Sequence, residues 1–149
     1  MTRYLVDTNI VSVASPTVAI GHTEIIQWMD SHSRDLFLSA ISVAEIAGGI
    51  AKLERQGAKR KAADLSVWLE TVLHLYGDRV LVFDSATAQI AGMLSDLARG
   101  RGHSPGLADV IIAATARRHE LIILSRNERH FAPMDMNVID PFKQIPSDK

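Results

Sequence analysis

Short apolar runs alternate with longer segments of helical periodicity along almost the whole sequence. The short runs predict strands at residues 4–6, 36–38, 80–83, 121–124 and 136–139. The longer segments predict helices over residues 23–31, 42–55, 58–76, 85–100 and 107–119. Strands that are apolar on both faces and separated by helices are typical of a parallel sheet covered on both sides. We therefore expect an α/β fold, a three-layer α/β/α sandwich, with all 149 residues in one domain.

Polar side chains follow several of the predicted strands at the points where the strands end. Asp7 directly follows the first strand, and Ser125 and Asn127 directly follow the strand at 121–124. Glu45 falls in the first turn of the helix expected after the second strand. In parallel sheets the carboxyl ends of the strands share one edge, and ligands bind beyond it. These side chains are therefore expected at a common edge.

Asp109 is expected at the same edge because of the helix that it begins. This helix leads into the strand at 121–124 and should run antiparallel to it. At about 1.5 Å per residue, the ten steps from Asp109 to His119 span about 15 Å, close to the length of a short strand. The first turn of the helix then lies level with the carboxyl edge, where Asp109 can meet Asp7 and Glu45.

Three carboxylates with a nearby amide form an oxygen-only ligand set, which suits Mg²⁺ or Mn²⁺. The sequence contains no cysteine, which excludes disulfides and thiolate metal sites and favours a reducing cytoplasm. A divalent ion at such a site can orient a phosphate and activate a water molecule. Hydrolysis of phosphodiester bonds is the reaction that this set of residues predicts.

Each acidic residue also has a purely structural interpretation. Asp7 can cap a following helix, and Asp109 gains from the dipole of the helix that it begins. Glu45 forms a capping-box pattern with Ser42. The six histidines show no zinc-site spacing, and surface or capping positions are expected for them. The expected convergence of the three carboxylates is what favours a metal site over three separate caps.

The net charge of −1, from 16 Lys and Arg against 17 Asp and Glu, limits nucleic-acid binding to a local basic patch. Two sets of basic residues are candidates for contacts with RNA. One set, a stripe on a predicted helix that is equally consistent with a solvated face, comprises Lys52, Arg55 and Lys59. The other set, in segments expected near the carboxyl edge, comprises Arg101, Arg126 and Arg129.

Four segments of the sequence resemble the successive motifs of PIN-domain proteins, specifically the VapC-type toxins. They are LVDTNI at residues 5–10, LSAISVAEI at 38–46, ADVIIAATA at 108–116 and LSRN at 124–127. The order and spacing of the motifs agree from Tyr4 to about Pro141, and the segment around Asp109 is the most specific of them.

This resemblance implies an α/β/α sandwich with Mg²⁺- or Mn²⁺-dependent endoribonuclease activity and a homodimeric state. It also implies inhibition by a small antitoxin, through which the pair would contact operator DNA. The acidic quartet of the family maps onto Asp7, Glu45, Asp109 and the position of Asn127. Many relatives carry an acid at this fourth position, and an Asp is common where this chain has His130. These two departures weaken the case for a second metal site: the three carboxylates are expected to hold only one ion firmly without substrate, and the number of ions, one or two, stays open.

Other interpretations of an early aspartate fit less well. A haloacid-dehalogenase-type phosphatase needs a second Asp two residues after the first, where this chain has Asn9. A receiver domain needs a Lys after a late strand, where this chain has Arg126. The remaining alternative is a non-catalytic PIN-like module that binds nucleic acid or a partner protein.

The sequence also predicts a cytoplasmic protein without a membrane segment. The first apolar run is short and ends at Asp7, unlike a signal peptide. No apolar run approaches the roughly 20 residues of a membrane helix.

Overall fold

A five-stranded parallel sheet forms the centre of the protein in the computed structural model, which describes residues 2–18 and 21–147. The strand order is β3-β2-β1-β4-β5, and Tyr4 in β1 lies opposite both Leu36 in β2 and Ile122 in β4. The strands are β1 (Tyr4–Val6), β2 (Leu36–Ser39), β3 (Val80–Leu81), β4 (Ile122–Leu124) and β5 (Val138–Ile139). Because every pairing is parallel, all the carboxyl ends meet at one edge, as expected from the sequence.

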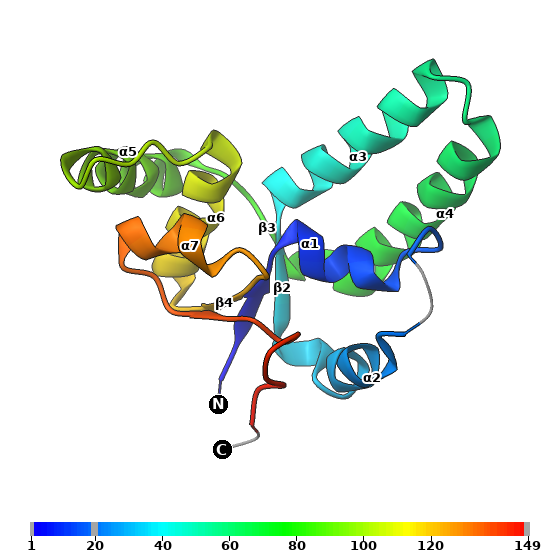
Figure 1. Ribbon diagram of the computed structural model, residues 1–149, viewed down its shortest axis with the longest axis horizontal. Coiled ribbons are helices and arrows are strands. Elements are labelled where there is room, and N and C mark those ends of the chain that lie inside the picture. Colours follow the sequence, from blue (N-terminus) through cyan, green and yellow to red (C-terminus); the bar gives the residue numbers. More distant parts are fainter. Residues whose placement is uncertain (1, 19–20, 148–149) are drawn as a thin grey trace.

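Helices cover both faces of this sheet (Figure 1). They are α1 (Thr8–Val11), α2 (Thr23–Ser31), α3 (Ala40–Arg55), α4 (Lys59–Tyr76), α5 (Ser85–Gly100), α6 (Leu107–His119) and α7 (Glu128–Phe131). Helices α5, α6 and α7 lie on one side of the sheet, and α1 to α4 lie on the other (Figure 1). The expected three-layer α/β/α architecture is confirmed.

The alternation of side chains along β1 produces two separate apolar cores. Leu5 points to one face and packs in a buried cluster with Leu94 of α5 and Ala113 of α6. Its neighbours Tyr4 and Val6 point to the opposite face, into a cluster built with α2, α3 and α4. Successive strand residues face opposite sides of a sheet, so a strand covered on both faces must be apolar throughout.

The start of α3 differs from the sequence prediction. The helix begins at Ala40, and the hydroxyl oxygen of Ser39 accepts a hydrogen bond from the backbone N–H of Ile41 at 3.2 Å. The capping box proposed for Ser42 and Glu45 is therefore wrong. The Ser42 hydroxyl is buried and has no hydrogen-bond partner among the described residues. Glu45 lies in the second turn of α3 and is not needed as a capping residue.

Strand β3 is also shorter than predicted. It ends at Leu81, and the Val82 and Phe83 side chains that follow are 65% and 44% exposed. Because β3 forms one border of the sheet, pairing only with β2, the chain can leave it early without breaking a second ladder.

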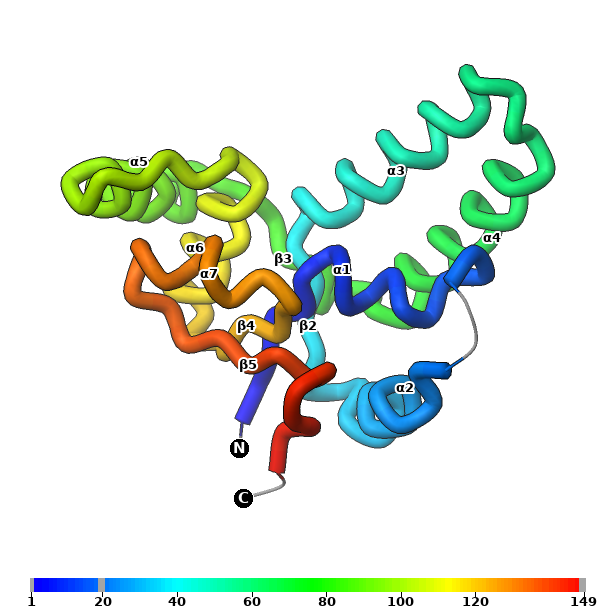
Figure 2. Tube along the Cα trace, viewed as in Figure 1, coloured from blue at the N-terminus to red at the C-terminus, as the bar shows by residue number. Residues whose placement is uncertain are grey.

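Helices α3 and α4 form a hairpin that projects away from the sheet (Figure 2). Gly57, with a φ of 86°, lies in the turn between them, where the left-handed backbone favours glycine. No helix within residues 2–18 and 21–147 combines the length and apolar character needed to cross a membrane.

Candidate active site

The residues that the sequence placed at the carboxyl edge line one open cavity of about 440 Å³. Asp7, Glu45, Asp109 and Asn127 all contribute to it, from four separate segments of the chain. The rest of the lining comprises Thr8, Asn9, Ser12, Gly106, Ala108 and His130. The expectation that the three carboxylates share one edge is confirmed. We call this space the acidic cavity.

Asp7 is fixed in the cavity by hydrogen bonds to both of its carboxylate oxygens. It is the N-cap residue of α1, and its Oδ1 accepts a hydrogen bond from the Thr8 backbone N–H at 2.8 Å. Its Oδ2 accepts a hydrogen bond from the Ser125 hydroxyl at 2.7 Å. The Asn127 backbone N–H in turn donates to the Ser125 hydroxyl at 2.9 Å. Asp7 therefore caps a helix and faces the cavity at once, so its two interpretations are compatible.

Burial places an electrostatic cost on the Asp7 carboxylate, whose residue is only 5% exposed. Burial raises the pKa of this carboxyl, and the negative charge of Asp109 raises it further. The hydrogen bonds from Ser125 and Thr8, and the nearby His130, act in the opposite direction. A cation in the cavity would relieve this cost.

Replacing Asp7 by Asn is expected to stabilise the metal-free protein at neutral pH. Because folding raises the pKa of Asp7, wild-type protein loses stability as the pH rises from about 3.8 to the higher folded-state pKa. Asp7→Asn lacks this loss, so the difference in unfolding free energy in favour of the variant should grow across that window and then stay constant. Thermal melts in chelator over this pH range measure it. A difference that shrinks with rising pH would contradict the assignment.

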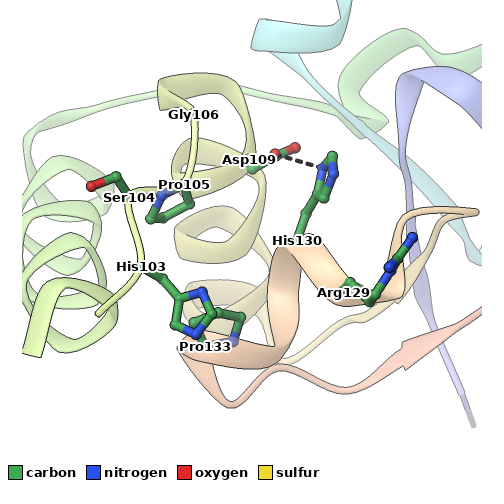
Figure 3. A pocket seen from close by; sticks show the side chains of 8 residues that line it. All are labelled: His103, Ser104, Pro105, Gly106, Asp109, Arg129, His130 and Pro133. Atoms are coloured by element: carbon green, nitrogen blue, oxygen red, sulfur yellow. Dashed lines mark ion pairs between the residues drawn. The ribbon is translucent and has the colours of Figure 1, made fainter. Parts of the chain in front are cut away.

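Glu45 and Asp109 are held by neighbours that the sequence did not identify. The Thr8 hydroxyl donates to Oε1 of Glu45 at 2.7 Å, which links α1 to α3. Oδ2 of Asp109 lies 3.1 Å from Nδ1 of His130, and Figure 3 shows the two side chains pointing toward each other from α6 and α7. His130 is exposed, as expected for a surface histidine, but it also belongs to the site. The resemblance described in the sequence analysis marked the position of His130 but not its contact with Asp109.

The donor set of the cavity fits a hard divalent cation. It offers three carboxylates and the side-chain amide of Asn127, and the chain has no thiol to compete. In the part of the chain that the structure describes, no three Asp, Glu or His side chains lie close enough to share an ion. Their present partners are Thr8, Ser125 and His130. The three carboxylates therefore converge on one cavity, as expected, but the expectation that their oxygens lie close enough to share an ion is not met. Capture of one ion by all three requires side-chain rotation.

The basic residues proposed for RNA binding separate into two groups. Arg126 and Arg129 line cavities that border the acidic cavity. Arg101 lines none of these cavities. Its guanidinium donates two hydrogen bonds to the Asp135 carboxylate, at 2.7 and 3.0 Å. The stripe expected on one helix is wrong: Lys52 and Arg55 lie in the last turn of α3, whereas Lys59 begins α4 after the turn at Gly57. The three residues lie toward the far end of the α3–α4 hairpin.

Comparison with known proteins gives one consistent result. The model of the PIN domain family matches residues 4–135. Toxin FitB of Neisseria gonorrhoeae is 33% identical over 139 residues, covering 93% of this chain and 97% of that protein. VapC ribonuclease Y4jK of Sinorhizobium fredii is 31% identical over 143 residues, covering 93% and 97%. The solved structure of FitAB bound to an IR36 DNA fragment contains a chain with a TM-score of 0.81 and 31% identity, covering 98% of this chain and 99% of that one.

Proposed function

Since this chain belongs to the PIN-domain family, as a toxin of the VapC and FitB type, we propose that it cleaves RNA with the help of a bound Mg²⁺ or Mn²⁺. One observation carries the proposal most directly. Three carboxylates from segments far apart in the sequence, Asp7, Glu45 and Asp109, line a single cavity at the carboxyl edge of the sheet. Capping and hydrogen bonding account for these carboxylates one at a time but not for all three lining one cavity, where unscreened carboxylates repel each other.

The residues of the acidic cavity would have two roles in phosphodiester hydrolysis, binding the ion and orienting its ligands. Asp7, Glu45 and Asp109 would hold the ion, which supplies positive charge for the phosphate and lowers the pKa of a bound water. Ser125 and Thr8 orient Asp7 through hydrogen bonds to its two oxygens. This support leaves the Asp7 carboxylate with a defined direction before substrate arrives.

The metal-dependent cleavage of RNA tests this function directly. Purified protein free of any antitoxin is expected to cut cellular RNA in Mg²⁺ or Mn²⁺ and to stop cutting when chelator is added. The alternative, a non-catalytic module that binds nucleic acid or a partner, predicts RNA retention without new ends in either condition. Mapping the new ends would also identify the preferred sequence.

The family relationship supports an antitoxin, operator DNA and a second copy of the chain as partners of the toxin. We propose that an antitoxin protein inhibits it, and that operator DNA contacts the pair through the antitoxin. A solved structure of FitAB bound to an IR36 DNA fragment supports an assembly of this kind. We also propose a homodimer, since the surface exposes large apolar side chains that association would cover, among them Phe83, Met93 and Leu107. Light scattering that finds only monomer at micromolar concentration would contradict the dimer.

A further inference from the structure

A second cavity, of about 250 Å³, borders the acidic cavity, and we call it the basic cavity. Its lining comprises Arg126, Asn127, Glu128, Arg129, His130 and Lys143. Asn127 and His130 line both cavities, so these two side chains form a shared wall. We propose that the basic cavity binds an RNA phosphate adjacent to the one that is cut, and that the segment after β5 thereby forms part of the substrate site. This inference rests on the proposed ribonuclease function.

The charges of the basic cavity are suited to a phosphate. Arg126 and Arg129 form no ion pair with a carboxylate among residues 2–18 and 21–147. Lys143 lies 3.6 Å from Glu128, so three cationic side chains face one carboxylate. This local excess contrasts with the net charge of −1 for the whole chain. The three carboxylates of the neighbouring acidic cavity repel the RNA backbone. The excess positive charge of the basic cavity offsets part of this repulsion.

The Arg126 guanidinium is already positioned in the absence of RNA. Its central carbon lies 4.0 Å from the centre of the Phe142 ring, in stacking distance, and the Arg126 backbone N–H donates to Oδ1 of Asn9 at 3.4 Å. A planar guanidinium can donate two parallel hydrogen bonds to a phosphate. Holding it in place beforehand reduces the entropy lost on binding.

The Phe142 ring is itself held by contacts from two sides. The Phe142 backbone N–H donates to Oδ1 of Asp140 at 2.9 Å, which fixes the turn after β5. The ring of His22, just before α2, meets the Phe142 ring edge-on at 4.9 Å between centroids. Phe142 is therefore a positioning residue that acts through Arg126.

This part of the site lies outside the span that defines the family. The family model matches residues 4–135, whereas Phe142 and Lys143 come after that span. Figure 3 shows Arg129 and His130 rising from α7, with His130 directed toward Asp109. Because Asn127 and His130 line both the acidic and the basic cavity, an RNA strand that crosses this shared wall would meet both cavities.

Salt-dependent RNA binding tests the proposal without relying on cleavage. The parent protein carries Asp109→Asn, and the probe is a short fluorescein-labelled single-stranded RNA that the wild type cuts, measured by anisotropy in chelator. Arg126→Ala and Lys143→Ala are each expected to weaken binding several-fold. Each should also reduce the slope of log affinity against log salt by about 0.7, the value for one lost phosphate contact on a single strand. The matched control is Arg34→Ala, an exposed arginine before β2 at the opposite edge, which should change neither quantity.

Two comparisons distinguish the loss of a phosphate contact from a general loss of positive charge or of folded structure. Phe142→Leu should weaken binding when Arg126 is present and have no further effect beside Arg126→Ala, because it acts through that side chain. A probe in which a neutral methylphosphonate, on a 2′-O-methyl sugar, replaces the phosphate next to the cut should bind the parent and Arg126→Ala equally.

Failure of the phosphate site and failure of the proposed ribonuclease function give different results. If the wild type cuts RNA but Arg126→Ala and Lys143→Ala keep the affinity and salt slope of the parent, the phosphate site is refuted and the ribonuclease function stands. If the wild type cuts no RNA and the parent binds none, the proposed function itself fails.

Discussion

Asp109→Asn is expected to reduce RNA cleavage by several orders of magnitude while leaving the protein folded. The ion would lose one of its three anionic ligands. The structural cost should be small because Asn is nearly isosteric with Asp and is tolerated in the first turn of α6. Its loss of helix-dipole energy is on the order of 0.3–1 kcal/mol. The contact of Asp109 with His130 is partly exposed, so its removal adds little.

Cleavage rates measured at limiting Mg²⁺, alongside thermal melts, decide this prediction. Partial recovery at high Mn²⁺ is expected, since a weakened site can still be filled by mass action. Asp64→Asn, on the exposed surface of α4, is the matched control and should cut at the wild-type rate. A folded Asp109→Asn protein that cuts RNA as fast as the wild type would rule out Asp109 as a ligand.

Phe131→Ala is expected to lower the free energy of unfolding by about 3–5 kcal/mol, the usual loss for a fully buried phenylalanine. The Phe131 side chain is completely buried in the core that also contains Ile123 and Met134. Helix α7 has only four residues, and no side chain hydrogen-bonds its N-terminus. Phe131 is the buried residue of α7, whereas the ion pairs of His130 with Asp109 and of Glu128 with Lys143 lie at the surface.

Urea denaturation followed by circular dichroism measures this loss, with Phe131→Leu as the matched control. Leucine keeps most of the apolar volume, so its cost should stay below about 1.5 kcal/mol. Because Arg129 and His130 directly precede the ring, the alanine variant should also bind RNA more weakly than its folded fraction predicts. Equal stability of the two variants would show that α7 is held by other contacts.

The sequence was sufficient to locate Asp109 because helix α6 is long and its neighbours are regular. The helix spans Leu107–His119 and leads directly into β4, so its length fixes the height of its first turn relative to the sheet. The same reasoning placed Asp7 and Asn127 correctly, since each follows a strand of a parallel sheet.

Glu45 lines the cavity as expected, although the helix boundary next to it was predicted wrongly. Ser39 and Ser42 can both cap a helix, and the local pattern favoured Ser42 because Glu45 follows it at capping-box spacing. Tertiary packing decides, because Ser39 is also the last residue of β2 and the chain turns directly into α3.

The contacts that complete the site could not be predicted from the sequence. Thr8 and Glu45 are 37 residues apart, and Ser125 and Asp7 are 118 apart, so no local pattern links them. Helix α7 is too short to show helical periodicity, so the sequence marked the position of His130 only through the family resemblance and did not predict its contact with Asp109. Phe142 contacts Arg126 only because the chain returns past β4 as β5.

The junctions at the ends of β1 and β2 have a consequence for how such a protein can evolve. A single residue, Asp7, separates β1 from α1, and none separates β2 from α3. An insertion or deletion at either junction would rotate or displace an acidic side chain, so chain length there should be invariant among working descendants. The loop at residues 101–106 and the turn around Lys143 lie outside these junctions. Insertions and deletions in these two segments would leave the acidic cavity intact. Related proteins can therefore differ there, and so in the RNA that they bind, while keeping the same acidic cavity.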